Sequence, residues 1–208
     1  MDWTVIGAMV ALAALIVRGV VAFGMAGKEA GKLRRSGQTV RRLREQALAR
    51  RWTWEPAAFE PTVPVGRMGR LPEVRQRGAA RGRFRQRDAT VAVLAAVVPS
   101  GFESELGNDH GTTVLTMVVT MDAPELTGDL RLDPRRGEPG YEISGSLAGL
   151  IGGDGLAALA RVQNPAADVI GGRAAFLFTS LRGMDELDRV LAATDDFLSG
   201  LAAGQPSA

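Results

Sequence analysis

Few residues of this 208-residue chain belong to the types that carry most enzyme chemistry. The sequence has no cysteine and a single histidine, His110. Disulfides, thiolate metal sites and cysteine nucleophiles are therefore excluded, and one chain cannot build a site from two imidazoles. His110 follows Asp109 and lies near Ser100 and Ser104, a combination that suggests a hydrolase. Adjacent side chains of an extended loop point apart, however, so we expect His110 to be a surface residue without a catalytic role.

Two further patterns invite a cofactor or a metal ion. The stretch from Gly152 to Ala160 contains a Gly-x-Gly-x-x-Ala pattern, but no strong strand precedes it and too few residues follow it for a dinucleotide-binding fold. We interpret it as a turn followed by a short helix. The chain also has four closely spaced carboxylates, on Asp122, Glu125, Asp129 and Asp133. They are better explained as solvated loop groups than as a metal cage, so we expect neither a cofactor nor a metal.

Positive charge is the abundant chemistry, and it is concentrated in the first half of the chain. Residues 28–51 carry a net charge of +7 and residues 52–87 carry +5, whereas residues 88–208 carry −10. Membrane leaflets and nucleic acids are the two abundant polyanions of a cell. The asymmetry therefore predicts that the N-terminal part of the chain meets one of these surfaces.

The segment from residue 3 to residue 26 is long and apolar enough to cross a membrane as a helix. It carries one charge, Arg18, in 24 residues, and a helix of about 20 residues spans the hydrocarbon layer. Arg18 lies close to the end of the segment, from which its guanidinium can reach the headgroups. The alternative is a cleaved signal peptide. The missing basic residues before the segment and the many basic residues after it oppose that alternative.

The basic residues after this segment orient it by the positive-inside rule. We expect a single-pass protein of the cell membrane, with its N-terminus outside and its C-terminal domain cytoplasmic. Residues 28–51 would form a basic juxtamembrane stalk, helical from about Thr39 to Arg50, that binds anionic lipid headgroups. The alternative is that these charges only direct topology. The predicted lipid-binding residues are Lys28, Lys32, Arg34, Arg35, Arg41, Arg42 and Arg44.

A second group of arginines lies farther along the chain. Arg81, Arg83, Arg85 and Arg87 alternate with other residues, so in one strand their guanidinium groups would share a face. With Trp52, Trp54 and other nearby aromatic residues they suggest a platform for single-stranded nucleic acid, on which bases stack and phosphates meet cations. No RNP1-like, KH-like or helix-turn-helix pattern accompanies them. We therefore favour an outer strand whose arginines face solvent, lipid or the acidic remainder of the domain.

The rest of the pattern predicts an α+β fold. Two runs rich in Val and Thr, residues 89–98 and 112–121, are predicted to pair as strands, and shorter strands are expected at 129–132, 141–144 and 174–180. Apolar residues at helical spacing from Met184 to Leu201 predict a closing helix, with Leu187 and Phe197 on the face that packs on the sheet.

The predicted organisation has four parts. A transmembrane helix (1–27) and the basic helical stalk (28–51) precede the cytoplasmic domain (52–202), a mainly antiparallel sheet covered by the C-terminal helix. Residues 203–208 are expected to be a disordered tail.

Several motifs together resemble a known group of proteins. They are ALARRWTWEP, RGRFRQRDATVAVLAAV, TTVLTMVVTM, LRLDP and VIGGRAAFLFTS, in that order after an apolar N-terminal segment. This arrangement resembles a family of uncharacterised actinobacterial single-pass membrane proteins, and the resemblance extends over nearly the whole chain. It implies the same membrane-anchored architecture and supplies no activity or site residues.

These observations favour a membrane-anchored, non-enzymatic interaction or scaffold protein. Its expected partner is the layer of anionic headgroups of the membrane, and another membrane protein is a second candidate partner. A membrane-tethered nucleic-acid-binding protein is the second hypothesis, and a hydrolase that uses the loop around His110 is the third.

Overall fold

The chain forms one continuous antiparallel sheet with helices packed against it. The structure, a computed structural model, describes residues 37–58, 74–98, 112–135, 139–178 and 187–205. The apolar segment 3–26, the residues from Lys28 to Arg35 and the loop that contains His110 lie outside these residues. None of the helices in the described ranges combines the length and the apolar character needed to cross a bilayer.

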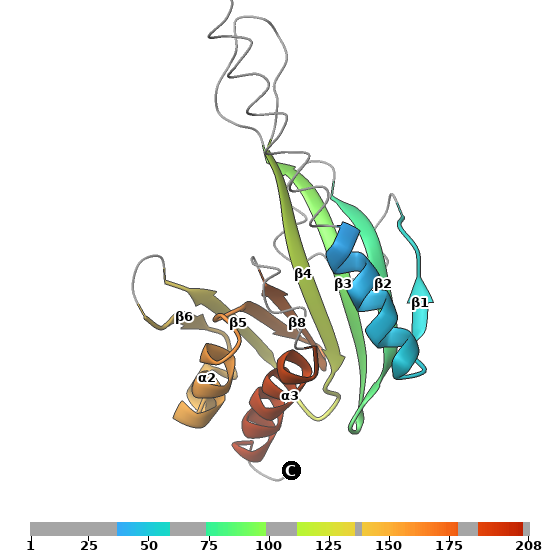
Figure 1. The fold of residues 1–208 in the computed structure, drawn as a ribbon. Coiled ribbons are helices and arrows are strands. Elements are labelled where there is room, and N and C mark those ends of the chain that lie inside the picture. The colour runs from blue at the N-terminus through green and yellow to red at the C-terminus, as the bar shows by residue number, and fades with distance from the viewer. Residues whose placement is uncertain (1–36, 59–73, 99–111, 136–138, 179–186, 206–208) are drawn as a thin grey trace, which may run out of the picture. The chain divides into compact units, whose positions relative to one another are not determined.

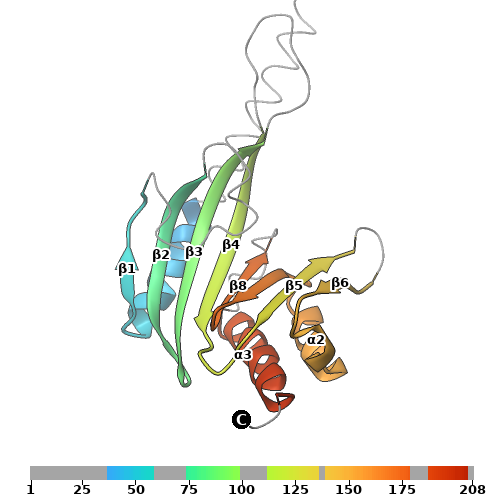
Figure 2. The ribbon, with the colours of Figure 1, turned by 180° about the vertical axis from the view of Figure 1, so that it is seen from behind.

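The sheet has eight strands in the order β1-β2-β3-β4-β8-β7-β5-β6, and every neighbouring pair is antiparallel (Figures 1 and 2). The predicted α+β fold with a mainly antiparallel sheet is therefore confirmed. The strands are β1 (Thr53–Glu55), β2 (Arg75–Phe84), β3 (Arg87–Val98), β4 (Thr112–Asp122), β5 (Asp129–Pro134), β6 (Tyr141–Ser144), β7 (Ala166–Ile170) and β8 (Arg173–Phe178).

The two longest strands, β3 and β4, are the pair predicted from their Val- and Thr-rich sequences. They are paired without a break from Ala89↔Met121 to Val98↔Thr112. Strand β8 adds to the other side of β4, although about 50 residues separate them in sequence. The shorter strands β7, β5 and β6 continue the sheet from β8. Because β3 and β4 lie near the middle of the order, their apolar side chains form the centre of the core.

The closing helix is α3 (Leu187–Ala203), and it packs against the sheet as predicted. Leu187 and Phe197 are both buried, and the Phe197 ring meets that of Phe176 on β8 edge to face, with ring centroids 5.9 Å apart. Aromatic pairs in this geometry contribute beyond the area that they bury. A short helical turn, η2 (Ala148–Leu150), leads into α2 (Gly153–Ala160), which lies beside α3.

A further helix occupies residues 37–49, drawn in blue in Figure 1, and lies over β2 and β3. Leu43 and Ala47 on its inner side are 1% and 0% exposed and belong to the main core cluster. Thr39 is the first residue of the compact unit that holds the sheet. The C-terminal half of the predicted basic stalk is therefore helical, as expected, and contributes side chains to the core of the domain.

Trp54 on β1 and Trp52, just before β1, pack against two glycines of β2. A Cβ atom on Gly82 would overlap the ring of Trp52, and one on Gly78 would lie 2.5 Å from the ring of Trp54 and 3.3 Å from Val40 of the helix. Glycine at these two positions lets the indoles sit directly on the backbone of β2. Both indoles are therefore used in packing on the side of the sheet that carries the helix.

A tight turn at Arg85 and Gln86 divides the arginine-rich segment. Phe84 at the end of β2 pairs with Arg87 at the start of β3, and Arg85 adopts a φ of +52°. The prediction of one strand with four arginines on one face is therefore wrong. Arg81 and Arg83 share one face, Arg85 is in the turn, and Arg87 projects to the opposite face. The usual turn residues Gly, Asn and Pro are absent from RFRQRD, so no local pattern indicates this hairpin.

The packing of Trp52 on Gly82 leads to a stability prediction. We expect Gly82→Ala to lower the free energy of unfolding by about 1 to 3 kcal/mol, because the added methyl group displaces the indole. The control is Gly149→Ala, since nothing lies within 4 Å of a Cβ atom at that position. Denaturant unfolding of both variants measures the difference. Equal stability of the two variants would show that the indole does not sit on the β2 backbone.

Candidate anion-binding surface

The helix of residues 37–49 places the described part of the predicted lipid-binding set on its outer side. Arg41, Arg42 and Arg44 are all exposed, while Leu43 between them is buried. This distribution of exposed and buried side chains follows from the helical period. Val40, Leu43 and Ala47 recur at three- and four-residue spacing and face the sheet. The other four predicted residues, Lys28, Lys32, Arg34 and Arg35, lie outside the described residues.

The outer side of this helix keeps most of its positive charge. Arg41 forms an ion pair of 2.9 Å with Glu45 one turn away, but both side chains are more than half exposed. Such pairs are solvated and contribute little, so Arg41 can exchange this partner for another anion. Leu48, which is 56% exposed, lies one helical turn after Arg44. This leucine adds exposed apolar surface beside the arginines.

The helix is also fixed at its C-terminal end. The Arg50 guanidinium donates to the Gln46 carbonyl and forms an ion pair with Asp188 on α3, with Nη2 2.6 Å from Oδ2. This contact joins residues 138 positions apart in the sequence. Arg41, Arg42 and Arg44 therefore project from a helix that is held by apolar packing on one side and by α3 at one end.

Charge is unevenly distributed over the described residues. Those between 37 and 98 include eleven arginines and three carboxylates, whereas those between 112 and 205 include five arginines and ten carboxylates. Some of these arginines and carboxylates form ion pairs with each other within the domain. An arginine that is paired in this way has less charge to offer to an external anion.

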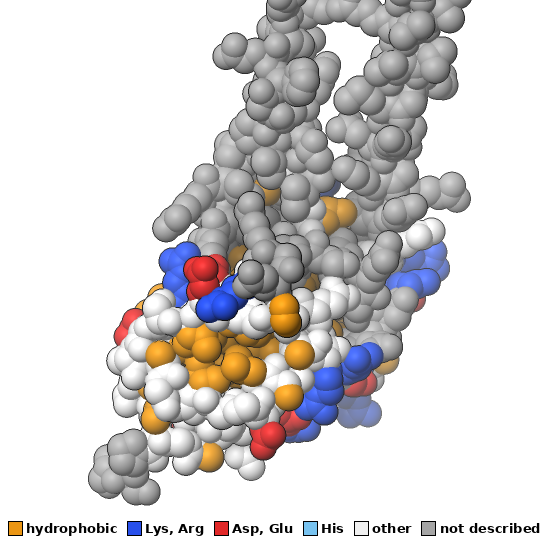
Figure 3. All heavy atoms as spheres, turned by 90° about the vertical axis from the view of Figure 1, so that its left-hand side faces the viewer, with side chains coloured by type: hydrophobic (Ala, Val, Ile, Leu, Met, Phe, Trp, Pro, Cys, Tyr) orange, Lys and Arg blue, Asp and Glu red, His pale blue; other side chains and the backbone are white. Residues whose placement is uncertain are grey.

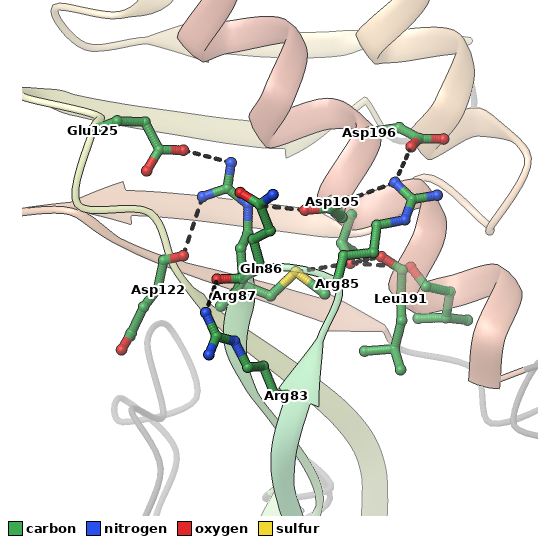
Figure 4. Close-up of polar contacts among 12 residues, drawn as sticks. Arg83, Arg85, Gln86, Arg87, Asp122, Glu125, Leu191, Asp195 and Asp196 are labelled. Carbon is green, nitrogen blue, oxygen red and sulfur yellow. Dashed lines mark hydrogen bonds and ion pairs between the residues drawn. The ribbon is translucent and has the colours of Figure 1, made fainter. Parts of the chain in front are cut away.

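Arg85 and Arg87 have internal partners (Figure 4). Arg85 Nη1 lies 2.6 Å from Asp195 and 2.7 Å from Asp196, both on α3. Arg87 bridges Asp195 at 2.9 Å and Glu125 at 2.5 Å, and it also donates to the Asp122 carbonyl at 3.2 Å. The Asp195 side chain is 7% exposed and that of Arg87 is 11% exposed. The β2–β3 hairpin is thus tied to α3 and to the segment after β4 by partly buried charges.

These contacts favour the charged forms of Arg85, Arg87 and Glu125. Burial lowers the pKa of Arg87, but its hydrogen bonds and charge interactions with Glu125 and Asp195 raise it by more. Hydrogen bonds to Asp196 and Asp195 likewise raise the pKa of Arg85. For Glu125, burial raises the pKa, and the contacts with Arg87 outweigh this and leave it below its ordinary value. Arg85 and Arg87 are consequently neutralised within the domain.

The sequence analysis missed the role of Asp195. The signal in the sequence that could have revealed this role is the position of Asp195. It follows Thr194 on the apolar stripe of the closing helix, and the helical spacing places this stripe against the sheet. A carboxylate at a buried helical position requires a charged partner from another element. The sequence does not show which arginine supplies it.

The other predicted candidates are dispersed. The carboxylate of Asp122 pairs with Arg173, that of Asp133 with Arg131, and that of Asp129 accepts a hydrogen bond from the Ser146 hydroxyl. Within the described ranges no group of three or more His, Cys, Asp or Glu side chains is arranged to hold a metal ion. The Gly-x-Gly-x-x-Ala stretch forms the start of α2, and η2 rather than a strand precedes it.

The opposite end of the sheet has a different character. Figure 3 looks onto the end that carries β6 and α2, where hydrophobic side chains gather within a rim of polar and charged groups. Ile143 on the edge strand β6 is 38% exposed, and Leu150, Ile151 and Leu156 are only partly buried. Most of the described arginines belong instead to residues 37–98, which include the helix of residues 37–49 and β2.

Comparisons of the chain with protein-family models, with curated proteins and with solved structures give no match.

The charge cluster leads to a prediction with an internal control. We expect Asp195→Asn to lower the free energy of unfolding by about 3 kcal/mol, because Arg87 loses a partner in a partly buried site. Asp196→Asn, at the adjacent position where the side chain is 46% exposed, should cost less than about 1 kcal/mol. Urea unfolding at neutral pH gives both values. If Asp196→Asn were the more damaging change, the buried carboxylate would not be the one that holds the hairpin.

Proposed function

We propose that this chain is a membrane-anchored, non-enzymatic interaction protein. Its helix of residues 37–49, called the basic helix below, binds anionic lipid headgroups. In this proposal the apolar segment 3–26 crosses the membrane, the N-terminus lies outside, and the α+β domain is cytoplasmic. The domain then serves as a scaffold at the membrane surface. The observation that carries the proposal is the row of exposed arginines, Arg41, Arg42 and Arg44, on a helix fixed to the domain.

The position of this helix in the sequence supports the proposal. Ten residues separate Ala26 from Gly37, so even a fully extended connection spans at most about 40 Å. Four further predicted lipid-binding residues, Lys28, Lys32, Arg34 and Arg35, fall on this connection. Each basic group near an anionic leaflet contributes about 1 kcal/mol, within the ~8 to 10 Å over which the surface potential decays.

Nucleic-acid binding, the second hypothesis, loses its main support. Base stacking requires an open aromatic face, and Trp52 is 7% exposed because it packs on Gly82. Trp54 is likewise directed onto Gly78. Of the four arginines that suggested phosphate contacts, Arg85 and Arg87 bind carboxylates of the same chain.

The proposal predicts salt-sensitive binding of the fragment from Lys28 to Ala208 to vesicles that contain phosphatidylglycerol. We expect the triple variant Arg41→Gln, Arg42→Gln, Arg44→Gln to weaken this binding roughly a hundredfold at physiological salt, at about 1 kcal/mol for each charge. The matched control is Arg131→Gln, Arg135→Gln, Arg161→Gln, which removes three exposed charges elsewhere in the domain. Sedimentation with vesicles measures both.

An equal loss in the two triple variants would mean that net charge, rather than the helix, drives binding. Circular dichroism of each fragment checks that it remains folded. Submicromolar binding of single-stranded RNA that depends on Trp52 would favour the second hypothesis instead.

The proposal also predicts that residues 3–25 remain in the mature protein, since the many basic residues that follow the segment resist export. N-terminal sequencing of the protein extracted from membranes tests this. A mature chain that begins at Gly27 would contradict the membrane anchor.

A further inference from the structure

The face of the β2–β3–β4 sheet opposite to Trp52 carries a row of polar side chains. Register pairs join Thr53 to Arg81, Arg81 to Thr90, and Thr90 to Thr120 across four strands. Paired residues project to the same side of a sheet, so these four side chains form one line. The next line toward the hairpin contains the pairs Arg83↔Asp88 and Asp122↔Arg173.

These two lines border a groove with a volume of about 520 Å³. Volumes of this size accommodate small organic ligands. Figure 4 shows Arg83 and the Asp122 carboxylate directed away from the charge cluster formed by Arg85, Arg87 and Asp195. The groove is therefore separate from that cluster and lies on the other face of the sheet from the basic helix.

The polar groups of the groove differ in whether they have partners. Arg173 forms an ion pair with Asp122 at 3.1 Å, and Arg81 forms one with Glu55 at 2.5 Å. Within the described ranges, the Arg83 guanidinium makes a single, long hydrogen bond, 3.4 Å, to the Gln86 carbonyl. Among the described residues Asp88 has no ion-pair partner, although Arg83 is its register neighbour. The hydroxyl groups of Thr90 and Thr120 likewise have no hydrogen-bond partner there.

This set of groups fits a ligand with two kinds of polar atom. The Arg83 guanidinium and the threonine hydroxyls donate hydrogen bonds, as the binding of a phosphate oxyanion requires. The Asp88 carboxylate is an acceptor only, and it would repel a second anionic group while accepting hydrogen bonds from hydroxyls. A neutral polyol leaves Arg83 without a counter-charge, and a bare phosphate leaves Asp88 without a donor.

We propose that the groove binds a phosphorylated polyol, with the phosphate on Arg83, Thr90 and Thr120 and a polyol hydroxyl on Asp88. Such a group occurs in soluble sugar and polyol phosphates and in the headgroups of phosphatidylinositol and phosphatidylglycerol. If the outer side of the helix of residues 37–49 lies on the membrane, the groove faces away from it, since helix and groove are on opposite faces of the sheet. That geometry favours the soluble source.

Calorimetric titration of the full-length chain in a nonionic detergent tests the proposal. The probes are inositol 1-phosphate, inorganic phosphate and inositol. We expect inositol 1-phosphate to bind more tightly than either of its parts. Arg83→Gln should weaken its binding about tenfold or more, as expected for the loss of a charge-assisted contact. Arg77→Gln, an exposed arginine on the same strand that does not line the groove, is the control and should bind like the wild type.

Asp88→Asn separates the two halves of the site. It should weaken the binding of inositol 1-phosphate and leave that of inorganic phosphate unchanged or tighter, because the variant removes a negative charge near the phosphate. Absence of inositol 1-phosphate binding at millimolar concentration, or an equal loss in Arg83→Gln and Arg77→Gln, would overturn the proposal. Unchanged melting temperatures of Arg83→Gln and Asp88→Asn confirm that the variants are folded.

Two further arms identify the source of the ligand and keep this site distinct from the lipid-binding helix. Vesicles with phosphatidylinositol, compared with vesicles with phosphatidylserine, compete with inositol 1-phosphate only if the groove takes a lipid headgroup. The triple variant Arg41→Gln, Arg42→Gln, Arg44→Gln should retain inositol 1-phosphate binding even where it loses vesicle binding. Loss of both in that variant would place the binding on the helix and contradict the groove.

Discussion

The contact of Trp52 and Trp54 with the glycines of β2 determines how the N-terminal half of the domain presents its charges. The indoles occupy the side of β2 at Gly78 and Gly82, where side chains would otherwise project. Val40 of the basic helix packs at the same place, so the helix is seated on this side. Residues at alternate positions of a strand face opposite sides, and Arg81 and Arg83 therefore lie on the other face. One packing arrangement thus assigns the helix and the groove to opposite sides of the same strands.

Charge compensation within the domain decides which arginines can meet a partner. Arg50, Arg85 and Arg87 form ion pairs with carboxylates of α3, which lie more than a hundred residues away in the sequence. Arg87 also pairs with Glu125 in the segment after β4. Burial of the Asp195 carboxylate is unfavourable unless its charge is paired. Arg85 and Arg87 of the hairpin supply that pairing. Arg41, Arg42 and Arg44 on the helix of residues 37–49 and Arg83 in the groove are exposed instead. The two proposed anion-binding surfaces are built from these exposed charges.

The two surfaces suit different anions for physical reasons. The helix offers a convex row of long, solvated cations with an exposed leucine, which matches a diffuse layer of headgroups and makes binding sensitive to salt. The groove offers donors and carboxylate acceptors on paired strands, which matches a single small molecule. If both proposals hold, a domain held at a membrane by the first surface keeps the second accessible to a soluble ligand.

The sequence alone determined the features that depend on local pattern. The apolar, Val- and Thr-rich runs at residues 89–98 and 112–121 predicted β3 and β4, and the helical spacing that includes Leu187 and Phe197 predicted α3 and its buried face. The absence of cysteine and the single histidine limited the chemistry, and the charge asymmetry led to the prediction of an anionic partner, which stays a prediction. Tertiary structure decided what depends on contacts between distant segments. The order of β4 beside β8, the partners of Arg85 and Arg87 on α3, and the seating of Trp52 on Gly82 have no local signature. The turn at Arg85 also escaped prediction, because its positive φ is stabilised by the β2–β3 pairing and the ion pairs to α3 rather than by a residue type that favours such a turn.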